Sequence, residues 1–423
     1  MIGELLELRR MLRTPRLAPD EWARLRDEKL RAVVRHAHDR VPYYRQLFRA
    51  ARLSPDDIRT TADLARLPVT TKDDLRRAGA AAVVDDPAAL RDRATVLTSG
   101  TSGEPFTIVS TRRELARRRL VDFRAMLSAG VTWRDVIAIV GPEHERRARA
   151  HDRLGWFRTE IVPGALPPDE QIRRLQRLSP TVLWAYPTVL RAILQRVDYR
   201  LHDVCRPRML ITSSEVFDPV LRDRLAAVAQ VPTFNFYGTN EVGRIAQECP
   251  AHDGLHVNAD RVVFELADAQ GRRVDGEGSV VVTSLDAYAM PFLRYRVGDL
   301  CAPLAGTCRC GSTFPRIAAP TGREWDMVTL PSGRLLSPVA FQVVLRGFGG
   351  IDLYRMLQEA PDRIVVTIVP GKSFATDSLP LLEERLLASL GERIGLEIRL
   401  SEFMPAGGRK FKVFESRIGR GAG

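Results

Sequence analysis

The chain has 423 residues, 45% hydrophobic and 27% charged, which is the composition of an ordinary globular protein and a length that favours two or more domains. No apolar run reaches the ~18 residues that span a bilayer, so we expect no membrane-spanning segment. The formal net charge of +12 comes almost entirely from arginines, and no nucleic-acid fold signature accompanies it.

The predicted elements begin with helices. Apolar residues at three- and four-residue spacing predict helices over 22–36 and 43–51, within a helical segment that covers residues 1–80. The first ten residues carry acidic side chains inside an apolar stretch, so we expect an amphipathic helix rather than a signal peptide, and a cytoplasmic protein. Basic and apolar residues alternate over 112–124, which favours a solvated helix face and no nucleic-acid partner.

Strand-like and helix-like runs then alternate up to about residue 240. Such alternation predicts a layered, mainly parallel α/β domain. The runs are strands over 136–140, 182–186, 209–212 and 233–236, with a helix over 219–228.

The pattern changes twice in the remaining chain. Residues 255–320 read as strands only, for example 262–266 and 279–283, and predict a β-rich subdomain. After residue 322 a strand over 362–369, a helix over 379–394 and a strand over 396–403 predict an α+β unit. We therefore expect an α/β protein with a large N-terminal domain, 1–321, and a small mobile C-terminal domain, 322–423.

The most informative stretch is the run Thr98-Ser-Gly-Thr-Ser-Gly103. Glycines allow the backbone to approach a ligand closely, and hydroxyl and backbone N–H groups donate to phosphate oxygens. The run lies between the apolar stretches 94–97 and 106–109, so we expect a strand–loop–strand turn. It is not a Walker loop, because no Gly-Lys-Ser/Thr closes it. The alternative interpretation is a plain hairpin loop.

Further motifs follow in a fixed order: Tyr237-Gly-Thr-Asn-Glu241, Arg294-Tyr-Arg-Val-Gly-Asp299, Gly322-Arg323-Glu-Trp-Asp326 and Gly407-Gly-Arg-Lys410-Phe-Lys412. Together with the loop, this series resembles the adenylate-forming (ANL) superfamily. The N-terminal stretches Val41-Pro-Tyr-Tyr-Arg45, Leu67-Pro-Val-Thr-Thr-Lys72 with Asp73-Asp-Leu75, and Ala185-Tyr-Pro187 resemble its phenylacetate-CoA ligase and CapK (coenzyme F390 synthetase-like) branch.

The resemblance implies an AMP-forming ligase that activates a carboxylic acid with ATP and Mg²⁺ and passes the acyl group to CoA. Its implied catalytic residues are Glu241 as the Mg²⁺ ligand, Arg323 as a ribose or phosphate contact, and Lys410 as the bridge between carboxylate and α-phosphate. Tyr237 offers a ring face to adenine, and Asp299 accepts the ribose hydroxyls. The implied nucleotide-binding residues are Thr98, Ser99, Gly100, Thr101, Ser102, Gly103, Ser214, Glu215, Tyr237, Gly238, Thr239, Asn240 and Asp299.

The acyl pocket is read from the same resemblance. Trp184 and the residues Tyr186, Ser213, Phe236 and Gly238 stand where the family places its carboxylate substrate. Aromatic walls of this kind suit an aryl or medium-sized acid.

Departures from the family pattern leave alternatives open. Glu104 stands where the phosphate loop usually continues with lysine, and Arg409 replaces the glycine before Lys410, so Arg409 and Lys412 compete for its role. The alternative acceptors are an amine or a carrier-protein thiol, and a third reading is a non-catalytic nucleotide-binding relative. Rotation about Arg323–Asp326 is expected to admit the acceptor, and a homodimer stays open.

The cysteines add a second signal. Cys249 and His256 lie upstream of the tight pair Cys308-Arg-Cys310, and three thiolates with one imidazole suit a tetrahedral structural Zn²⁺. His252 competes with His256 as the imidazole ligand. The alternative is a set of reduced, buried cysteines that serve as small apolar side chains.

Overall fold

The structure, a computed structural model, describes residues 2–98, 106–141, 155–217, 219–323, 328–336, 341, 344–345, 348, 350–371, 374–402 and 413–418. The chain divides into two compact units, and each unit takes two segments of the chain. Unit 1 comprises residues 1–131 and 234–320, and unit 2 comprises residues 132–233 and 321–423.

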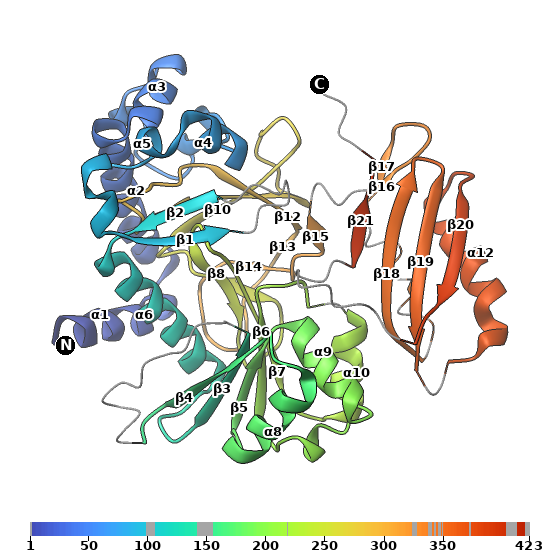
Figure 1. Ribbon diagram of the computed structural model, residues 1–423. Helices are drawn as coiled ribbons and strands as arrows, with labels where there is room; N and C mark the ends of the chain where they lie inside the picture. The colour runs from blue at the N-terminus through green and yellow to red at the C-terminus, as the bar shows by residue number, and fades with distance from the viewer. Residues whose placement is uncertain are drawn as a thin grey trace. The chain divides into compact units, whose positions relative to one another are not determined.

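Unit 1 opens with helices, including those that the apolar spacing predicts over 22–36 and 43–51 (Figure 1). These are α1 (Ile2–Arg13), α2 (Pro19–Arg40), α3 (Pro42–Ala50), α4 (Lys72–Ala78), α5 (Ala80–Val83) and α6 (Arg112–Ala129), joined by short 3₁₀ turns at Thr14–Arg16, Pro55–Asp57, Asp63–Arg66 and Pro87–Asp92. Proline stands in the first turn of α2 and of α3, where its missing N–H has no helical partner to lose. Nowhere in the described part of the chain is a helix both long enough and apolar enough to cross a membrane.

The strands of unit 1 are antiparallel to their neighbours within each sheet. They are β1 (Ala94–Thr98), β2 (Phe106–Ser110), β7 (Thr233–Thr239), β8 (Gly243–Glu248), β9 (Leu255–Val257), β10 (Val262–Ala267), β11 (Gly278–Ser284), β12 (Tyr295–Cys301), β13 (Pro303–Leu304) and β14 (Arg316–Ile317). β1 and β2 form a hairpin in which Thr98 pairs with Phe106, as the strand–loop–strand pattern predicts. The orders β10-β11-β12 and β13-β14-β9-β8-β7 confirm the β-rich character of 255–320.

Helix α6 corrects one sequence expectation. It begins with a capping box, in which Thr111 Oγ1 accepts from the Glu114 N–H and Glu114 accepts from the Thr111 N–H. The arginines of this helix are not all on a solvated face, because Arg124 is 1% exposed and donates to both carboxylate oxygens of Asp260 at 2.9 Å. Alternation with apolar residues shows which positions share a face of the helix. It does not show that a carboxylate from another segment contacts the buried face.

Unit 2 contains the parallel layer that alternating strands and helices predict. Its strands, in the order β6-β5-β3-β4, are all parallel. β3 reads Val-Ile-Ala-Ile-Val-Gly and is largely buried, as expected for a strand with helices on both faces. The elements are β3 (Val136–Gly141), β4 (Arg158–Pro163), α8 (Pro168–Leu178), β5 (Val182–Ala185), α9 (Pro187–Arg196), β6 (Met209–Ser213) and α10 (Pro219–Val228), with a 3₁₀ turn at Leu201–Asp203.

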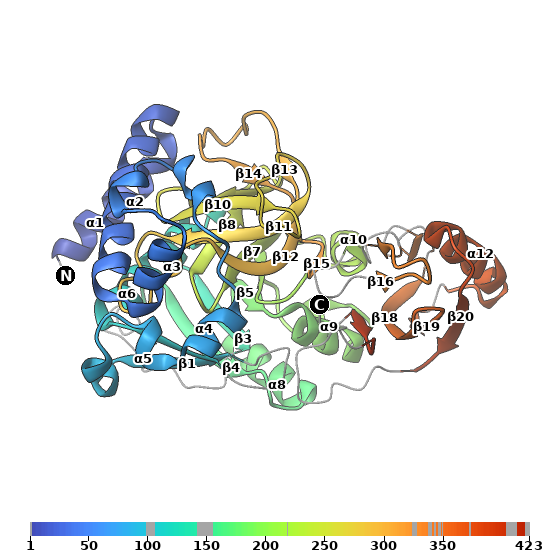
Figure 2. The same ribbon diagram turned by 90° about the horizontal axis from the view of Figure 1, so that it is seen from above.

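The last part of unit 2 is an α+β layer, in which α12 lies along the sheet beside β20 in both views (Figure 2). The sheet order is β20-β19-β18-β21. The predicted helix over 379–394 ends earlier, at Leu390, because Gly391 takes a φ of +70°, which stops a right-handed helix. The elements are β15 (Gly322–Arg323), β16 (Val328–Thr329), β17 (Leu335–Leu336), β18 (Ile351–Ala360), β19 (Arg363–Pro370), a 3₁₀ turn (Thr376–Ser378), α12 (Leu379–Leu390), β20 (Gly395–Leu400) and β21 (Phe414–Ser416).

Candidate active site

The Tyr237–Glu241 motif forms the end of β7 and the turn into β8. The two strands pair antiparallel, with a bulge between Tyr237 and Gly238. A Cβ on Gly238 would lie 2.5 Å from the Gly243 carbonyl oxygen, so only glycine allows the two strands to approach this closely. The sequence of the motif therefore fixes a tight turn that carries Thr239, Asn240 and Glu241.

Tyr237 and Asp299 come from different strands and meet directly. The Tyr237 hydroxyl donates to Asp299 Oδ2 at 2.7 Å, although 62 positions separate the two residues. Tyr237 is half-buried against the core of unit 1. The structure thus brings together two of the side chains that the motifs predict for nucleotide binding.

Glu241 is nearly enclosed, with 11% of its side chain exposed. Its Oε1 accepts from the Tyr295 hydroxyl at 3.2 Å and lies 3.8 Å from the Lys72 ammonium. Tyr295 belongs to the same strand, β12, as Asp299. Strand β12 therefore contains the predicted ribose acceptor, Asp299, and also donates a hydrogen bond to the predicted metal ligand, Glu241.

Arg118 contacts the turn of the Tyr237–Glu241 motif, and sequence reasoning missed this contact. Its guanidinium donates to the backbone carbonyls of Asn240 (2.7 Å) and Glu241 (2.6 Å), and so fixes the turn from α6. Burial lowers the pKa of Arg118, and the carboxylates of Glu114 and Glu241 oppose that shift. A basic residue on a helix gave no signal for this contact, since its partners are backbone atoms far along the chain.

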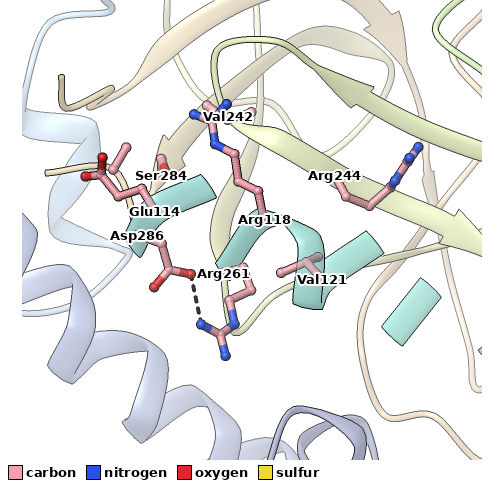
Figure 3. Close-up of a pocket in the computed structure, with 9 residues that line it drawn as sticks. Glu114, Arg118, Val121, Val242, Arg244, Arg261, Ser284 and Asp286 are labelled. Carbon is pink, nitrogen blue, oxygen red and sulfur yellow. Dashed lines mark hydrogen bonds and ion pairs between the residues drawn. The ribbon is translucent and has the colours of Figure 1, made fainter. Parts of the chain in front are cut away.

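A small cavity lies behind this turn (Figure 3). Its volume is about 20 Å³, which admits one water molecule but no nucleotide. Three arginines and two carboxylates line it, and Arg261 donates to Asp286 at 2.9 Å. Its lining consists of Glu114, Arg118, Val121, Val242, Arg244, Arg261, Ser284, Asp286 and Ala287. We read the cavity as support for the turn rather than as a ligand site.

Unit 2 carries three of the residues predicted for the acyl pocket, Trp184, Tyr186 and Ser213. The Trp184 indole N–H donates to Ser213 Oγ at 2.8 Å, which joins β5 to the end of β6. Tyr186 follows β5, and burial raises the pKa of its phenol, an effect that a hydrogen bond with Ser214 opposes. Ser214 itself is exposed and takes a φ of +71°, a strained value for a side-chain-bearing residue and one that recurs at functional turns.

Phe236 and Glu215 are held by neighbours in their own units. Phe236, in β7 of unit 1, is 1% exposed, with the Arg244 guanidinium 4.9 Å from its ring centre. In unit 2, Glu215 accepts from the Thr188 N–H at 3.0 Å and from its hydroxyl. Because Thr188 lies in the first turn of α9, this carboxylate caps the helix as well as standing at the motif position.

Other predicted residues lie outside what the structure describes. Ser99, Gly100, Thr101, Ser102 and Gly103 are not described, nor are Glu104, Asp326, Arg409, Lys410 and Lys412. Thr98 ends β1 and Arg323 ends β15, and only their backbones are described.

The four predicted metal ligands come together in unit 1. Their ligand atoms, from Cys249, His256, Cys308 and Cys310, all lie within 4.8 Å of one another. Cys249 and Cys308 sulfurs are 3.6 Å apart, and His256 Nε2 is 3.3 Å from Cys310 Sγ. His256 Nδ1 faces the Phe314 carbonyl at 3.4 Å, so the ring presents Nε2 to the thiols. This donor set fits tetrahedral Zn²⁺.

His252, the competing imidazole, has other neighbours. Its Nδ1 lies 3.7 Å from Glu248 Oε2, and its ring centre lies 4.7 Å from that of Phe234. Within the described residues, it is therefore His256 that joins the cluster.

Comparison with known proteins places the chain in a family. Phenylacetate-coenzyme A ligase of Aromatoleum evansii is 31% identical over 327 residues, which cover 74% of this chain and 72% of that protein. The chain belongs to the phenylacetate-CoA ligase family. The same ligase from Thermus thermophilus is 25% identical over 436 residues, or 93% of this chain and 96% of that one. No family model matches the sequence.

The family membership confirms the resemblance that the ordered motifs indicate. Among solved structures, 2-hydroxyisobutyryl-CoA ligase in the postadenylation state matches with a TM-score of 0.79 at 20% identity, over 96% of this chain and 90% of that one. This match shows that the chain has the same fold as that adenylate-forming ligase.

Proposed function

We propose that the chain is an AMP-forming ligase that activates an aryl or medium-sized carboxylic acid with Mg-ATP and transfers the acyl group to the thiol of CoA. Membership of the phenylacetate-CoA ligase family supports the reaction class. The substrate range rests on the aromatic side chains Trp184 and Tyr186 near the end of β5.

One observation supports the assignment to this chain's own residues. The Tyr237 hydroxyl bonds to the Asp299 carboxylate, and the adjoining turn and strand hold Glu241 through Tyr295. A flat ring, a two-oxygen acceptor and a hard-cation ligand are the groups that an adenosine phosphate with Mg²⁺ requires. A nucleotide-binding site is expected to place these three groups close together, and in unit 1 they lie close together.

In the first step an oxygen of the substrate carboxylate attacks the α-phosphorus, and the bond from that phosphorus to the pyrophosphate oxygen breaks. Catalysis then rests on alignment and on stabilising the negative charge that builds up. Asp299 would hold the ribose, Glu241 would hold Mg²⁺, and Lys410 would meet the charge on the α-phosphate. The hydroxyl-rich loop Thr98–Gly103 would hold the terminal phosphates.

In the second step the CoA sulfur attacks the acyl carbon and AMP leaves with one oxygen of the original carboxylate. We propose that the C-terminal segment, 322–423, acts as a mobile domain that turns about Arg323–Asp326 between the steps. Motions of this kind commonly limit turnover in enzymes.

We also propose that Cys249, His256, Cys308 and Cys310 bind a structural Zn²⁺. Their ligand atoms lie within 4.8 Å of one another, and four protein ligands leave no position for substrate. Bound zinc would tie the end of β8 and β9 to the segment between β13 and β14.

The test is release of pyrophosphate from Mg-ATP against a panel of aryl and alkyl acids, each with and without CoA. Release that depends on an acid, with an acyl-CoA product when CoA is present, is the expected result. Release that an amine or a carrier protein stimulates, with no acyl-CoA product, would contradict CoA as the acceptor. No acid-dependent release from protein that binds ATP would contradict ligase activity.

A further inference from the structure

Arg118 contacts two neighbouring peptide groups of the turn between β7 and β8. Its Nη1 donates to the Asn240 carbonyl at 2.7 Å, and its Nη2 donates to the Glu241 carbonyl at 2.6 Å. Figure 3 shows the side chain reaching from α6 towards this turn. Because each peptide group is planar, φ and ψ of Glu241 are the only soft torsions between the two carbonyls. A rigid guanidinium fork that holds both carbonyls therefore fixes the backbone of Glu241 itself.

The helix that carries Arg118 is itself anchored in unit 1. Glu114, one turn earlier in α6, is buried, and its Oε1 accepts from the N–H groups of Tyr288 at 2.6 Å and Ala289 at 2.9 Å. The stem of Arg118 passes Gly243, where an added Cβ would lie 3.5 Å from Arg118 Cγ. The guanidinium thus starts from a fixed helix and is guided along the turn that it holds.

The Glu241 carboxylate is held at one of its two oxygens. Oε1 accepts from the Tyr295 hydroxyl at 3.2 Å and lies 3.8 Å from the Lys72 ammonium. Among the residues that the structure describes, both contacts are made by Oε1 and none by Oε2, so Oε2 is the oxygen that a cation would meet. Mg²⁺ demands near-ideal octahedral geometry with ligands at about 2.0–2.1 Å. The direction of Oε2, and hence the backbone of Glu241, should therefore matter to the ion.

We propose that Arg118 is a positioning residue for Mg²⁺: by fixing the backbone of Glu241, it sets the affinity of the ATP complex for the ion. The inference rests on the proposed function, in which Glu241 holds Mg²⁺. In this role Arg118 touches neither the ion nor the nucleotide, and it acts only through the direction of the Glu241 carboxylate. Lysine cannot take over the role, because an ammonium is a point charge without a fork that spans two carbonyls.

Calorimetric titration of the full chain with ATP, once in Mg²⁺ and once in EDTA, tests this role without turnover. The ratio of the two ATP affinities, which we call the Mg²⁺ gain, reports metal binding in the complex. Arg118→Met should lower the Mg²⁺ gain about tenfold or more, as is typical when the partner of a metal ligand is lost, and should leave AMP affinity in EDTA within about twofold. Arg118→Lys, which keeps the charge but loses the fork, should behave like Arg118→Met. Arg119→Met removes an exposed arginine from the same helix and should change neither quantity.

A double-mutant cycle with Glu241→Gln shows whether Arg118 acts through Glu241. Glu241→Gln should lower the Mg²⁺ gain, and adding Arg118→Met should lower it no further, because residues that act as one unit are not additive. An equal loss of Mg²⁺ gain from Arg118→Met with and without Glu241→Gln would overturn the inference.

Three further outcomes would overturn the role of Arg118 alone. They are a wild-type Mg²⁺ gain in Arg118→Met, a wild-type Mg²⁺ gain in Arg118→Lys, and a loss of AMP affinity in Arg118→Met as large as its loss of Mg²⁺ gain. Wild-type protein that binds ATP with no Mg²⁺ gain would overturn the metal role of Glu241 and this inference with it. Wild-type protein that binds no ATP would overturn the proposed function as well.

Discussion

The side chains of unit 1 that we propose for nucleotide binding have hydrogen-bond partners outside their own motifs. Asp299 accepts from Tyr237, and Glu241 accepts from Tyr295. A hydrogen bond to a charged group is typically worth about 1.5–3 kcal/mol, so these pairs also fix the direction in which each carboxylate points. Orientation of this kind is what allows a carboxylate to distinguish one hydroxyl pattern from another.

Substitution at Asp299 should change nucleotide discrimination. We expect Asp299→Asn to raise the KM for ATP about tenfold or more, because a ribose hydroxyl loses its charged acceptor. The same variant should discriminate less between ATP and 2′-deoxy-ATP, measured by acid-dependent pyrophosphate release. Asp275→Asn, at an exposed position, is the control. A variant that still strongly prefers ATP to the deoxy form would contradict ribose binding by Asp299.

Lys410 should affect the chemical step more than nucleotide binding. Removing one stabiliser of transition-state charge typically lowers kcat by about 10²–10³-fold, so we expect Lys410→Ala to do so for adenylate formation while ATP affinity stays near that of the wild type. Arg409→Ala should be much milder. The reverse outcome, with Arg409→Ala inactive and Lys410→Ala active, would move the role by one residue.

The sequence supports a hypothesis about motif chemistry because each residue type suits its ligand, but it does not indicate the contacts between motifs. No spacing indicates that the Tyr237 hydroxyl meets Asp299, nor that Arg118 fixes the Asn240–Glu241 turn, because these partners are joined only by the fold. The solvated-face interpretation of the α6 arginines fails for the same reason: Asp260, the partner of Arg124, lies on a distant segment.

At the level of elements, continuous β-branched runs such as β3 were predictable, since burial on both faces leaves a plain apolar signature. The long strand β18, Ile351–Ala360, was missed, because its polar residues at 352, 355 and 358 have a three-residue spacing that is not the alternation typical of a strand. Helix α12 ends early because Gly391 takes a positive φ, which stops the helix although apolar residues follow it.

The Cys/His cluster should behave as a clamp between elements. We expect about one zinc per chain by elemental analysis, and Cys310→Ser should lose the metal and lower the unfolding temperature by roughly 3 °C or more. Cys301→Ser is the matched control, since that buried thiol donates to the Ala318 carbonyl rather than to the cluster. Wild-type protein that is purified without any bound metal, and that unfolds at the same temperature as Cys310→Ser, would contradict a zinc site.

The stability of the whole molecule should depend on pH through the buried Arg124–Asp260 pair. Burial alone would raise the pKa of Asp260, but the Arg124 charge and hydrogen bonds lower it from 3.8 to about 2. A carboxyl whose folded pKa lies below its unfolded value contributes stability above the unfolded value and loses it as pH falls through the folded one. This contribution should therefore be full above pH ~4 and disappear towards pH ~2.

Denaturant unfolding of wild type and Asp260→Asn measures this dependence. The wild type should be more stable by about 2 kcal/mol at pH 7, and the difference should shrink as pH falls below ~4. Asp92→Asn, at an exposed position, should match the wild type at each pH. A difference that stays constant down to pH ~2 would mean that ionisation of Asp260 does not contribute.

The central claim is that the reaction passes through an acyl-adenylate, and one isotope measurement tests it directly. The enzyme is given Mg-ATP, CoA and its acid substrate labelled with ¹⁸O in both carboxylate oxygens, and the products are weighed by mass spectrometry. Attack of the carboxylate on the α-phosphorus predicts one ¹⁸O in the phosphate of AMP and unlabelled pyrophosphate. Label in inorganic phosphate together with ADP, or AMP that carries no label, would contradict the account.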